Sequence, residues 1–569
     1  MEKYITITSL FLILLFFFAP AAAAEVQTNF DFFEFLESGG EYLMEYRLEN
    51  MSLAEKVGQL FQVGFHSKTV DQEIKDLIEN YHIGGVIYFG RNIDSLKQTA
   101  ALSNSLQDLA LSSGASLPLF ISADQEGGAV TRIKGGTHFP GNMALGAAAE
   151  PDLVRRTAAA AAEELKSIGI NVNLAPVLDV NNNSQNPVIG VRSFGAEPEL
   201  VAELGRAYIA GLQSKNVAAT AKHFPGHGDT ATDSHLDLPV IDHSRQRLER
   251  VELFPFKEAI AAGVDSIMTA HIYFPTIEEK SGIPATLSKS VLTGLLRQEL
   301  GFEGLIITDC MEMKAIANTF GTVEGAVKTV EAGSDTVLIS HSYQKQKRAI
   351  KALIQAVKSG RISEERIDQS VKRIIKLKAK RINLAEVNRA DPGAVNLDKH
   401  SQLAREIAEK AVTLIKNESI FPLQKISDKK LTLINFEMGR ASMAEEDFGK
   451  EFILADYLKK ELNQLTEITL NKNTNLTESR RREIAASDLV IVCTYNAVNN
   501  RYQIELAEEL AENSDLFVLA LRNPYDFKLI DKVQAFMTTY DYSPANQRAA
   551  AEFILGKIEA EGQLPVDVK

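Results

Sequence analysis

The sequence predicts an α/β fold in which a (β/α)8 barrel of the TIM type is followed by a smaller α/β (αβα) sandwich domain. Between about residues 52 and 380, short apolar β-branched runs alternate with amphipathic stretches, which is the pattern of βα units around a parallel sheet. There are eight such runs, and eight parallel strands can close into a barrel. The expected strands are residues 59–64, 84–89, 119–123, 172–177, 218–222, 265–270, 305–308 and 336–339.

A final helix is expected to complete the barrel domain, which we assign to residues 51–382. Ser363 is a suitable N-cap for a helix over residues 364–380. The apolar face of this helix would carry Ile367, Val371, Ile374 and Leu377. Residues 383–400 then lose periodicity and contain the turn signal Asp391-Pro392-Gly393, so they are expected to be a linker.

The rest of the chain, residues 401–569, is expected to form the smaller sandwich domain. A helix is predicted over residues 403–416. Strand-like runs follow at residues 431–436, 489–494 and 516–521, with helical stretches between them, which is typical of an α/β layer domain.

Residues 1–24 have the features of a secretory signal peptide. Lys3 gives a positive flank, residues 5–18 an apolar run, and Ala22-Ala23-Ala24 a small-residue cleavage site. We therefore expect a protein that is secreted or associated with the cell wall after cleavage near Ala24. An uncleaved membrane anchor is the alternative. Residues 25–50 are expected to form a helical lead-in, and no segment of the mature chain is expected to span a membrane.

The composition argues against several kinds of partner and cofactor. The formal net charge is −14 and no stripe of Lys and Arg is found, whereas nucleic-acid binding needs such a stripe. The only cysteines are Cys310 and Cys493, which are too few for a disulfide framework. We expect no cofactor and no nucleic-acid partner, and we expect the protein to be a monomer.

Charged residues follow most of the predicted barrel strands, at the edge where the active sites of such barrels lie. A ligand with many hydroxyl groups needs such a set of partners, because each buried hydroxyl without a partner costs free energy. The pattern therefore favours a sugar. One member, Asp179, could equally well cap the helix that follows it. The residues are Asp124, Arg132, Asp179, Arg192, Lys222, His223, Asp233, His235, His271 and Asp309.

Asp309 is the candidate nucleophile of a retaining glycosidase, because it follows the apolar run 305–308 and would be held rigidly at the end of that strand. A retaining mechanism also needs a group that protonates the departing oxygen. Asp233 and His235 are two residues apart, so in an extended loop both side chains project to the same side. Asp233 could then orient the imidazole of His235 as the acid/base, although most Asp-x-His triplets are surface or cap pairs.

The same loop also raises the possibility of a metal site. His223, His227, Asp229, Asp233 and His235 could in principle gather round zinc. Their spacing fits no helical His-Glu-x-x-His pattern, so we expect no metal.

The strand-five loop resembles a known family signature. The run from residue 222 to 230, Lys-His-Phe-Pro-Gly-His-Gly-Asp-Thr, with Asp233-Ser234-His235, is similar to that of the family 3 glycoside hydrolases. The similarity is to the bacterial β-N-acetylglucosaminidase branch, of the NagZ type. Further matches are residues 124–128 through Arg132, the loop 186–195, and Thr308-Asp309 with Met311-Glu312-Met313. The resemblance covers residues 52–380 strongly and the second domain more weakly.

This resemblance implies specific roles. Asp309 would be the nucleophile and His235, assisted by Asp233, the acid/base. The substrates would be muropeptides and similar cell-wall fragments with a terminal N-acetylglucosamine. The residues that would hold this sugar are Asp124, Arg132, Arg192, Lys222 and His223.

The sequence departs from the family pattern in two places. Cys310 follows the nucleophile, where many relatives have Asp, Ser or a bulkier residue, so the role of this neighbour is open. The second domain, at roughly 170 residues, is also short for this branch.

Three alternatives stay open on the sequence alone. The first is phosphorolysis, because a His acid/base, unlike a carboxylate, does not repel incoming phosphate. The second is a β-glucosidase or β-xylosidase of the same family. The third is a non-catalytic protein that binds cell-wall sugars, although such a protein would not need Asp309, Asp233 and His235 together.

Overall fold

The computed structural model describes residues 41–234, 237–423, 425–446, 451–471, 476–530 and 532–568. The chain divides into two compact units, Met1–Arg47 and Leu48–Lys569. The predicted signal peptide lies outside the described residues, as does most of the predicted lead-in, of which helix α3 (Glu41–Asn50) is described. No helix in the described part of the chain is long and apolar enough to cross a membrane.

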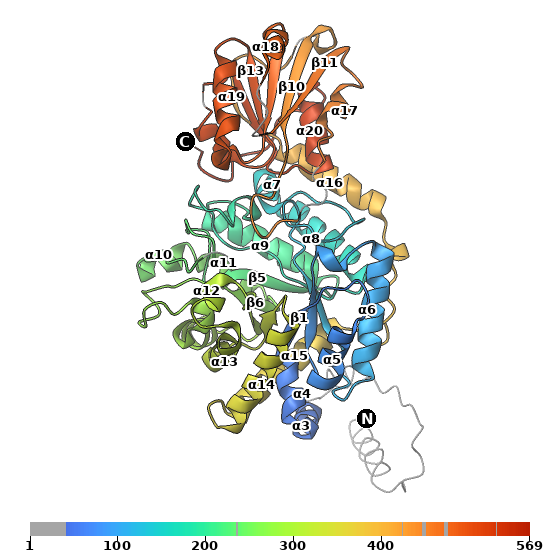
Figure 1. Ribbon diagram of the computed structural model, residues 1–569, viewed down its shortest axis with the longest axis vertical. Coiled ribbons are helices and arrows are strands. Elements are labelled where there is room, and N and C mark those ends of the chain that lie inside the picture. The colour runs from blue at the N-terminus through green and yellow to red at the C-terminus, as the bar shows by residue number, and fades with distance from the viewer. Residues whose placement is uncertain are drawn as a thin grey trace, which may run out of the picture. The chain divides into compact units, whose positions relative to one another are not determined.

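Eight parallel strands form the predicted barrel (Figure 1). Their order is β7-β6-β5-β4-β3-β2-β1-β8, and a bridge between Ile307 and Thr336 brings the two ends of the sheet together. The prediction of eight strands is therefore confirmed. The strands are β1 (Phe61–Gly64), β2 (Gly85–Tyr88), β3 (Phe120–Ala123), β4 (Val172–Asn173), β5 (Ala218–Phe224), β6 (Ser266–Thr269), β7 (Leu305–Thr308) and β8 (Val337–Ile339).

Strand β4 is shorter than the predicted range 172–177. Pro176 has no N–H and cannot donate to a sheet ladder. The segment still lies beside β5, because the carbonyl oxygens of Ala175 and Pro176 accept hydrogen bonds from Thr220 (2.9 Å) and Lys222 (3.1 Å). The chain after β4 is thus held next to β5 without being a regular strand.

Helices surround the barrel strands (Figure 1). The last one, α15 (Glu364–Arg381), confirms the predicted helix, and the Ser363 hydroxyl caps it by accepting from the N–H of Arg366. The four residues of its predicted apolar face are buried. The other α-helices are α4 (Leu53–Gln59), α5 (Gln72–Tyr81), α6 (Leu96–Leu111), α7 (Asn142–Ala148), α8 (Pro151–Ser167), α9 (Pro198–Gln213), α10 (Arg245–Arg250), α11 (Phe254–Ala261), α12 (Lys314–Ala317), α13 (Thr322–Ala332) and α14 (Tyr343–Lys358). A π-helix, η4 (Ser290–Glu299), and 3-10 turns η1 (Gly90–Asn92), η2 (Gly190–Arg192), η3 (Ala285–Leu287) and η5 (Pro392–Ala394) complete this part.

The second domain is a mixed six-stranded sheet with helices on both faces. One apolar core joins the sheet to α17 and α20, and another joins it to α18 and α19, as expected for a sandwich. The strand order is β11-β10-β12-β13-β14-β9, and only the pairing of β14 with β9 is antiparallel among the described strands. The strands are β9 (Thr413–Asn417), β10 (Lys430–Phe436), β11 (Gln464–Leu470), β12 (Leu489–Thr494), β13 (Leu516–Ala520) and β14 (Ala535–Thr538). The helices are α16 (Leu397–Ala411), α17 (Leu454–Leu458), α18 (Glu478–Ala485), α19 (Arg501–Ala511) and α20 (Pro544–Ile554), with 3-10 turns η6 (Ile426–Asp428), η7 (Ala497–Asn499) and η8 (Pro524–Lys528).

The predicted helix over residues 403–416 is wrong at both ends. Helix α16 begins six residues earlier, at Leu397, where the Asn396 side chain caps it by accepting from the N–H of Lys399. It ends at Ala411, and the β-branched and apolar residues that follow form β9 at the edge of the sheet. The predicted domain boundary within residues 383–400 stays a prediction.

Apolar contacts join the barrel to the second domain near the carboxyl ends of the barrel strands. Met143 and Val191 of the barrel belong to the same buried cluster as Tyr525 and Tyr540. The Asn181 side chain also donates a hydrogen bond to the Tyr525 hydroxyl (2.8 Å). These contacts lie beside the loops in which the site residues were predicted.

Candidate active site

A cavity of about 490 Å³ opens at the carboxyl ends of the barrel strands. Asp309, which directly follows β7, lines this cavity. So do all five residues predicted to hold a sugar, namely Asp124, Arg132, Arg192, Lys222 and His223. The structure therefore brings the predicted nucleophile and the predicted sugar-binding set together around one space.

The predicted acid/base pair is placed only in part. Asp233 lines a groove with Pro187, Thr232 and residues of the second domain. Its neighbour Ser234 lines the cavity of Asp309. His235 lies outside the described residues, so its role and the pairing with Asp233 stay predictions.

Lys222 and Arg192 share a buried carboxylate. The Lys222 ammonium lies 2.8 Å from Asp124 Oδ1 and 2.7 Å from Glu126 Oε1. The Arg192 guanidinium donates hydrogen bonds to both carboxylate oxygens of Glu126, at 2.8 and 2.7 Å, and so forms a bidentate pair. Burial alone would raise the pKa of Glu126, but Arg192 and Lys222 outweigh it and hold the pKa far below its usual range. Glu126 is thus ionised and fixes two cations at the cavity wall.

Sequence reasoning assigned no role to Glu126. It lies two residues after Asp124, in the loop that follows β3, and its side chain is almost fully buried. The available signals were its place in a charged loop at the end of a strand and its membership of the run 124–128 that resembles the family pattern. The burial that makes it an anchor for Lys222 and Arg192 depends on residues far away in the chain.

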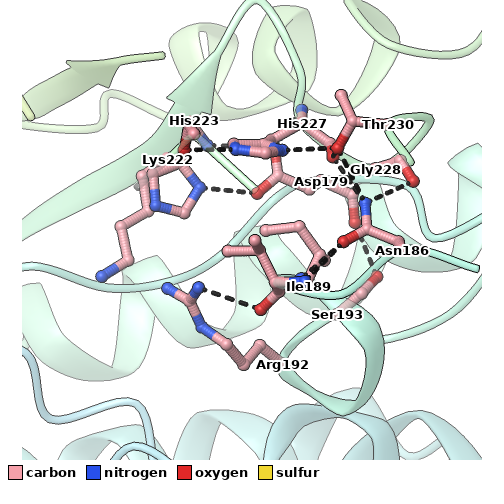
Figure 2. Close-up of polar contacts among 12 residues, drawn as sticks. Asp179, Asn186, Ile189, Arg192, Ser193, Lys222, His223, His227, Gly228 and Thr230 are labelled. Carbon is pink, nitrogen blue, oxygen red and sulfur yellow. Dashed lines mark hydrogen bonds and ion pairs between the residues drawn. The ribbon is translucent and has the colours of Figure 1, made fainter. Parts of the chain in front are cut away.

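Asp179 fixes the strand-five loop rather than capping a helix (Figure 2). Its Oδ1 accepts from the backbone N–H groups of His223 (3.1 Å) and His227 (2.7 Å), and its Oδ2 lies 2.7 Å from Nδ1 of His223. Burial alone would raise the pKa of Asp179, but His223 and these hydrogen bonds outweigh it and lower the pKa. Because an ionised carboxylate only accepts, Nδ1 of His223 carries the proton, and Nε2 of a neutral ring can accept from a ligand hydroxyl.

The next turn of the loop is held by His227 and Asn186 (Figure 2). The two ring nitrogens of His227 contact the hydroxyls of Thr230 (3.0 Å) and Ser234 (2.9 Å). Burial and the neighbouring His223 lower the pKa of His227 to about 4, so this ring is neutral at pH 7. The Asn186 amide donates to the carbonyl oxygens of His227 (2.8 Å) and Gly228 (2.9 Å). The loop is therefore braced as far as Ser234.

Asp309 is oriented by its own chain. Its Oδ1 accepts from the backbone N–H of Cys310 at 2.7 Å. The carbonyl oxygen of Cys310 lies 3.0 Å from Nε2 of His271, which must therefore donate. Burial raises the pKa of the Cys310 thiol to about 11, so this neighbour adds no charge next to the carboxylate at pH 7. His271, which the sequence placed at the end of strand six, therefore contacts the backbone next to Asp309 through this hydrogen bond.

The second domain contributes to the same cavity, which the sequence did not predict. Arg440, Met443, Ala444, Glu445 and Glu446 line it together with the barrel residues. They belong to the segment after β10, more than 100 residues beyond Asp309 in the chain. No local pattern in the sequence marks this segment, because its place depends on how the domains pack.

The comparison with protein families agrees with this geometry. The profile of the glycosyl hydrolase family 3 N-terminal domain matches residues 52–377, which is more than half of the chain. The chain belongs to glycosyl hydrolase family 3.

The curated and solved relatives of this family 3 chain are named as β-hexosaminidases or β-N-acetylglucosaminidases. β-Hexosaminidase A of Pseudoalteromonas piscicida is 32% identical over 561 residues, covering 88% of this chain and 92% of that protein. A β-N-acetylglucosaminidase/β-glucosidase of Cellulomonas fimi is 29% identical, covering 94% of this chain and 96% of that one. The structure of a family 3 β-N-acetylglucosaminidase from Paenibacillus sp. str. FPU-7 is 43% identical with a TM-score of 0.84, covering 91% of this chain and 99% of that chain. This family 3 protein is therefore a glycoside hydrolase, and the non-catalytic alternative is set aside.

One group of side chains in the described part of this glycoside hydrolase has the spacing of metal ligands. Asp229, His243 and Glu252 place one ligand atom each within 4.8 Å of one another. The Arg247 guanidinium, however, lies 3.7 Å from Asp229 and 3.3 Å from Glu252. A cation of the protein thus already compensates these carboxylates. His223 and His227, which the zinc interpretation invoked, are engaged by Asp179, Thr230 and Ser234.

Proposed function

We propose that this glycoside hydrolase is a retaining exo-β-N-acetylglucosaminidase. The observation that carries the proposal is the cavity at the barrel mouth, which Asp309 and all five predicted sugar-binding residues line together. The names of the relatives support the choice of N-acetylglucosamine over other sugars. Fixed donors and acceptors on one wall suit a terminal sugar ring, since each of its buried hydroxyls needs a partner.

In this proposal Asp309 attacks the anomeric carbon and the glycosidic bond breaks. His235, oriented by Asp233, gives its proton to the departing oxygen. The sugar then remains as an ester of the Asp309 carboxylate. In the second step His235 takes a proton from water, the water oxygen attacks the same carbon, and Asp309 leaves as the free carboxylate. Two inversions give net retention.

The binding residues have distinct parts in these steps. Lys222, Arg192 and Arg132 present cationic donors, and Asp124 presents carboxylate oxygens, so hydroxyl and acetamido groups can be matched one by one. The ring of His223, with its proton fixed on Nδ1 by Asp179, offers Nε2 to a hydroxyl. Because Glu126 and Asp179 hold these groups before substrate arrives, little ordering is left to occur at the moment of reaction.

We further propose that the natural substrates are muropeptides or related cell-wall glycans, and that the protein acts as a monomer, secreted or associated with the cell wall. The resemblance of the strand-five loop and the predicted signal peptide over residues 1–24 support this substrate and this location. Product analysis on purified muropeptides tests the substrate. N-terminal sequencing of the exported protein tests cleavage near Ala24.

Covalent trapping tests the mechanism directly. A slow fluorinated β-N-acetylglucosaminide should label the peptide that contains Asp309, and a label on another carboxylate would reassign the nucleophile. Rates on aryl β-N-acetylglucosaminide, β-glucoside and β-xyloside should favour the first. The same assay with and without phosphate distinguishes the reactions, because a phosphorylase would release the sugar 1-phosphate, whereas the proposed hydrolase releases the free sugar in both.

A further inference from the structure

Helix α16 of the second domain presents a buried histidine, His400, to helix α8 of the barrel. Its Nδ1 lies 2.8 Å from Oε1 of Glu164, and its Nε2 lies 3.2 Å from Oε2 of Glu163. Because carboxylate oxygens accept, both ring nitrogens must donate, which only the protonated imidazole can do. The hydrogen bond to Glu164 raises the pKa of His400, while burial acts in the opposite direction. His400 is thus a charged link between the two helices.

Glu164 extends this link to the segment 137–139 of the barrel. While its Oε1 accepts from His400, its Oε2 accepts from the backbone N–H of Thr137 (2.8 Å). The side chain of Glu164 is only 6% exposed, so water cannot readily replace either donor. The ring of Phe139 also lies beside the His400 ring, with the two centroids 6.1 Å apart. His400 therefore holds this segment both through Glu164 and by direct ring contact.

The segment 137–139 in turn holds the loop 124–128 at the active site. The carbonyl oxygen of Phe139 accepts from the N–H of Gly128 (2.8 Å), and Nε2 of His138 lies 3.0 Å from the carbonyl oxygen of Gly128. Glu126, two residues before Gly128, is the carboxylate that fixes the cations of the cavity wall. A continuous set of contacts therefore leads from His400 to that wall.

Few charges other than the two glutamates surround the His400 ring in the described structure. Lys215 lies on the far side of this group, 2.7 Å from Oε1 of Glu163. Helix α7, which also packs against α16, has no charged residue. In α20 the two charged residues, Arg548 and Glu552, pair with each other (2.9 Å). Loss of the His400 proton would therefore leave Glu164 with the N–H of Thr137 but without its charged partner.

We infer that protonated His400 is a positioning residue, which acts from the second domain through Glu164 and Phe139 to fix the loop 124–128. The inference rests on the proposed function, because this loop carries Asp124 and Glu126, which hold or support the groups that bind the terminal N-acetylglucosamine. His400 itself does not line the cavity of Asp309. It gives the second domain a part in substrate binding that depends on one proton.

His400→Gln tests this role by separating KM from kcat. The KM for an aryl β-N-acetylglucosaminide should rise about tenfold, as expected when one charge-assisted hydrogen bond is lost. The kcat should stay within about twofold, because the loop holds the sugar alike in the ground state and the transition state. Glu163→Gln, at a half-exposed position, should raise KM by about threefold. Glu406→Gln breaks an exposed ion pair between the same two helices, with Arg156, and should change neither constant.

Backbone hydrogen exchange gives a readout that does not depend on activity. In His400→Gln, peptides that cover residues 124–141 should exchange about tenfold faster than in wild type at pH 7, because the N–H groups of Gly128 and Thr137 are less protected. Peptides that cover β7, residues 305–308, should exchange at the wild-type rate. Glu406→Gln should leave both regions unchanged.

The wild-type protein provides a second test, which needs no change at a buried position. Because the folded pKa of His400 lies above the ordinary value of about 6.5, the proton is kept to a higher pH than in the unfolded chain and is lost as the pH rises further. The wild-type KM should therefore approach that of His400→Gln as the pH is raised from 6.5 to 9.5. Glu406→Gln should follow the wild-type curve throughout.

The outcomes separate this inference from the proposed function. If His400→Gln lowers kcat in proportion to the folded fraction but leaves KM and the exchange of residues 124–141 unchanged, His400 is only structural and the inference is wrong. It is also wrong if the difference in KM stays constant up to pH 9.5, because the proton then has no part. In both cases wild-type activity leaves the proposed function standing. If wild type cleaves no aryl β-N-acetylglucosaminide, the proposed function fails and the positioning role falls with it.

Discussion

The two ends of the barrel use buried carboxylates for different purposes. At the amino ends of the strands, Asp335 precedes β8 and accepts from Arg373 (3.0 Å), from the Ser370 hydroxyl (2.7 Å) and from Arg297. Asp265 precedes β6 and pairs in the same way with Lys380 and Arg381 of helix α15. At the carboxyl ends, Glu126 and Asp179 hold cations or rings that line the cavity of Asp309.

The carboxylates at the two ends of the barrel differ in the location of the cationic groups with which they pair. Arg373, Lys380 and Arg381 all come from α15, so the charges of Asp335 and Asp265 tie this helix to the sheet. Neither Asp265 nor Asp335 lines the cavity that contains Asp309. The amino end therefore uses ion pairs for stability, whereas the carboxyl end uses them to orient groups toward a ligand, which is the division of labour expected in such barrels.

The largest effect should come from the carboxyl end. Asp309→Ala is expected to lower kcat on an aryl β-N-acetylglucosaminide by at least about 10³-fold, because the attacking carboxylate is lost. Added azide should enter the vacated space, restore part of the rate and give the α-glycosyl azide, since only one inversion then occurs. Product analysis by NMR checks the anomer. A variant that keeps most of its activity without azide would rule out this nucleophile.

Glu126→Gln should reduce both activity and stability. The variant leaves Arg192 without its bidentate partner and Lys222 with only Asp124, and breaking a buried ion pair typically costs about 3 to 5 kcal/mol. We expect kcat/KM to fall by about 100-fold, in line with one or two lost charge-assisted contacts. Steady-state kinetics and urea unfolding measure the two losses. Glu258→Gln, which removes a surface partner of Arg206, should change neither, and an unaffected Glu126→Gln would mean that this anchor does not position the cations.

Asp335→Asn should separate stability from activity. Two arginines, Arg297 and Arg373, lose their buried carboxylate, so the free energy of unfolding should fall by about 3 kcal/mol. At 25 °C, kcat/KM should stay within about twofold of wild type, because this end of the barrel touches no substrate. Glu324→Gln, on the exposed pair with Arg361, should cost less than about 1 kcal/mol. A kinetic defect in Asp335→Asn as large as that of Glu126→Gln would contradict the division between the two ends.

The sequence could predict the parts of this comparison that depend on local pattern. Apolar β-branched runs located all eight barrel strands, and the convergence of strand ends put Asp309 beside residues as distant as Asp124. In the second domain β9 was hidden at the end of a helical pattern, and β14 is only four residues long. Strand β11 alternates between buried and exposed residues only over its last three positions, which is too short a stretch to mark a strand in the sequence.

Partners chosen by tertiary packing could not be predicted. Glu126 and Asp124 look alike in the sequence, yet one is a buried anchor and the other is partly exposed at the cavity. The segment 440–446 carries no motif, and its place in the cavity follows from contacts between the domains, such as those of Glu446 with Arg132 and with the N–H of Gly90. Burial decides the role of a charged residue in each case, and burial is a property of the whole fold.

Two fully buried lysines extend the comparison to pH. Lys222, at the carboxyl end, has two carboxylate partners, and although burial alone would lower its pKa, Asp124 and Glu126 raise it. Lys378 of α15 has no carboxylate within the described ranges, only the Gln59 side-chain oxygen at 2.8 Å and the Phe120 ring. Burial lowers its pKa to about 7.

The unfolded chain, with an ordinary lysine pKa of about 10.4, binds more protons than the folded chain between pH 7 and 10, so this group makes stability rise with pH across that window. Lys378→Met removes the titration. Relative to wild type, the variant should be most stable at or below pH 7, and the difference should shrink toward pH 10, with a slope of about 1 kcal/mol per pH unit near pH 8 to 9. The midpoints of urea unfolding of both proteins, taken from pH 6.5 to 9.5, measure this difference in stability. Lys376→Met, at an exposed position of the same helix, should show no such slope, and a pH-independent difference for Lys378→Met would mean that Lys378 is charged in the folded protein throughout this range.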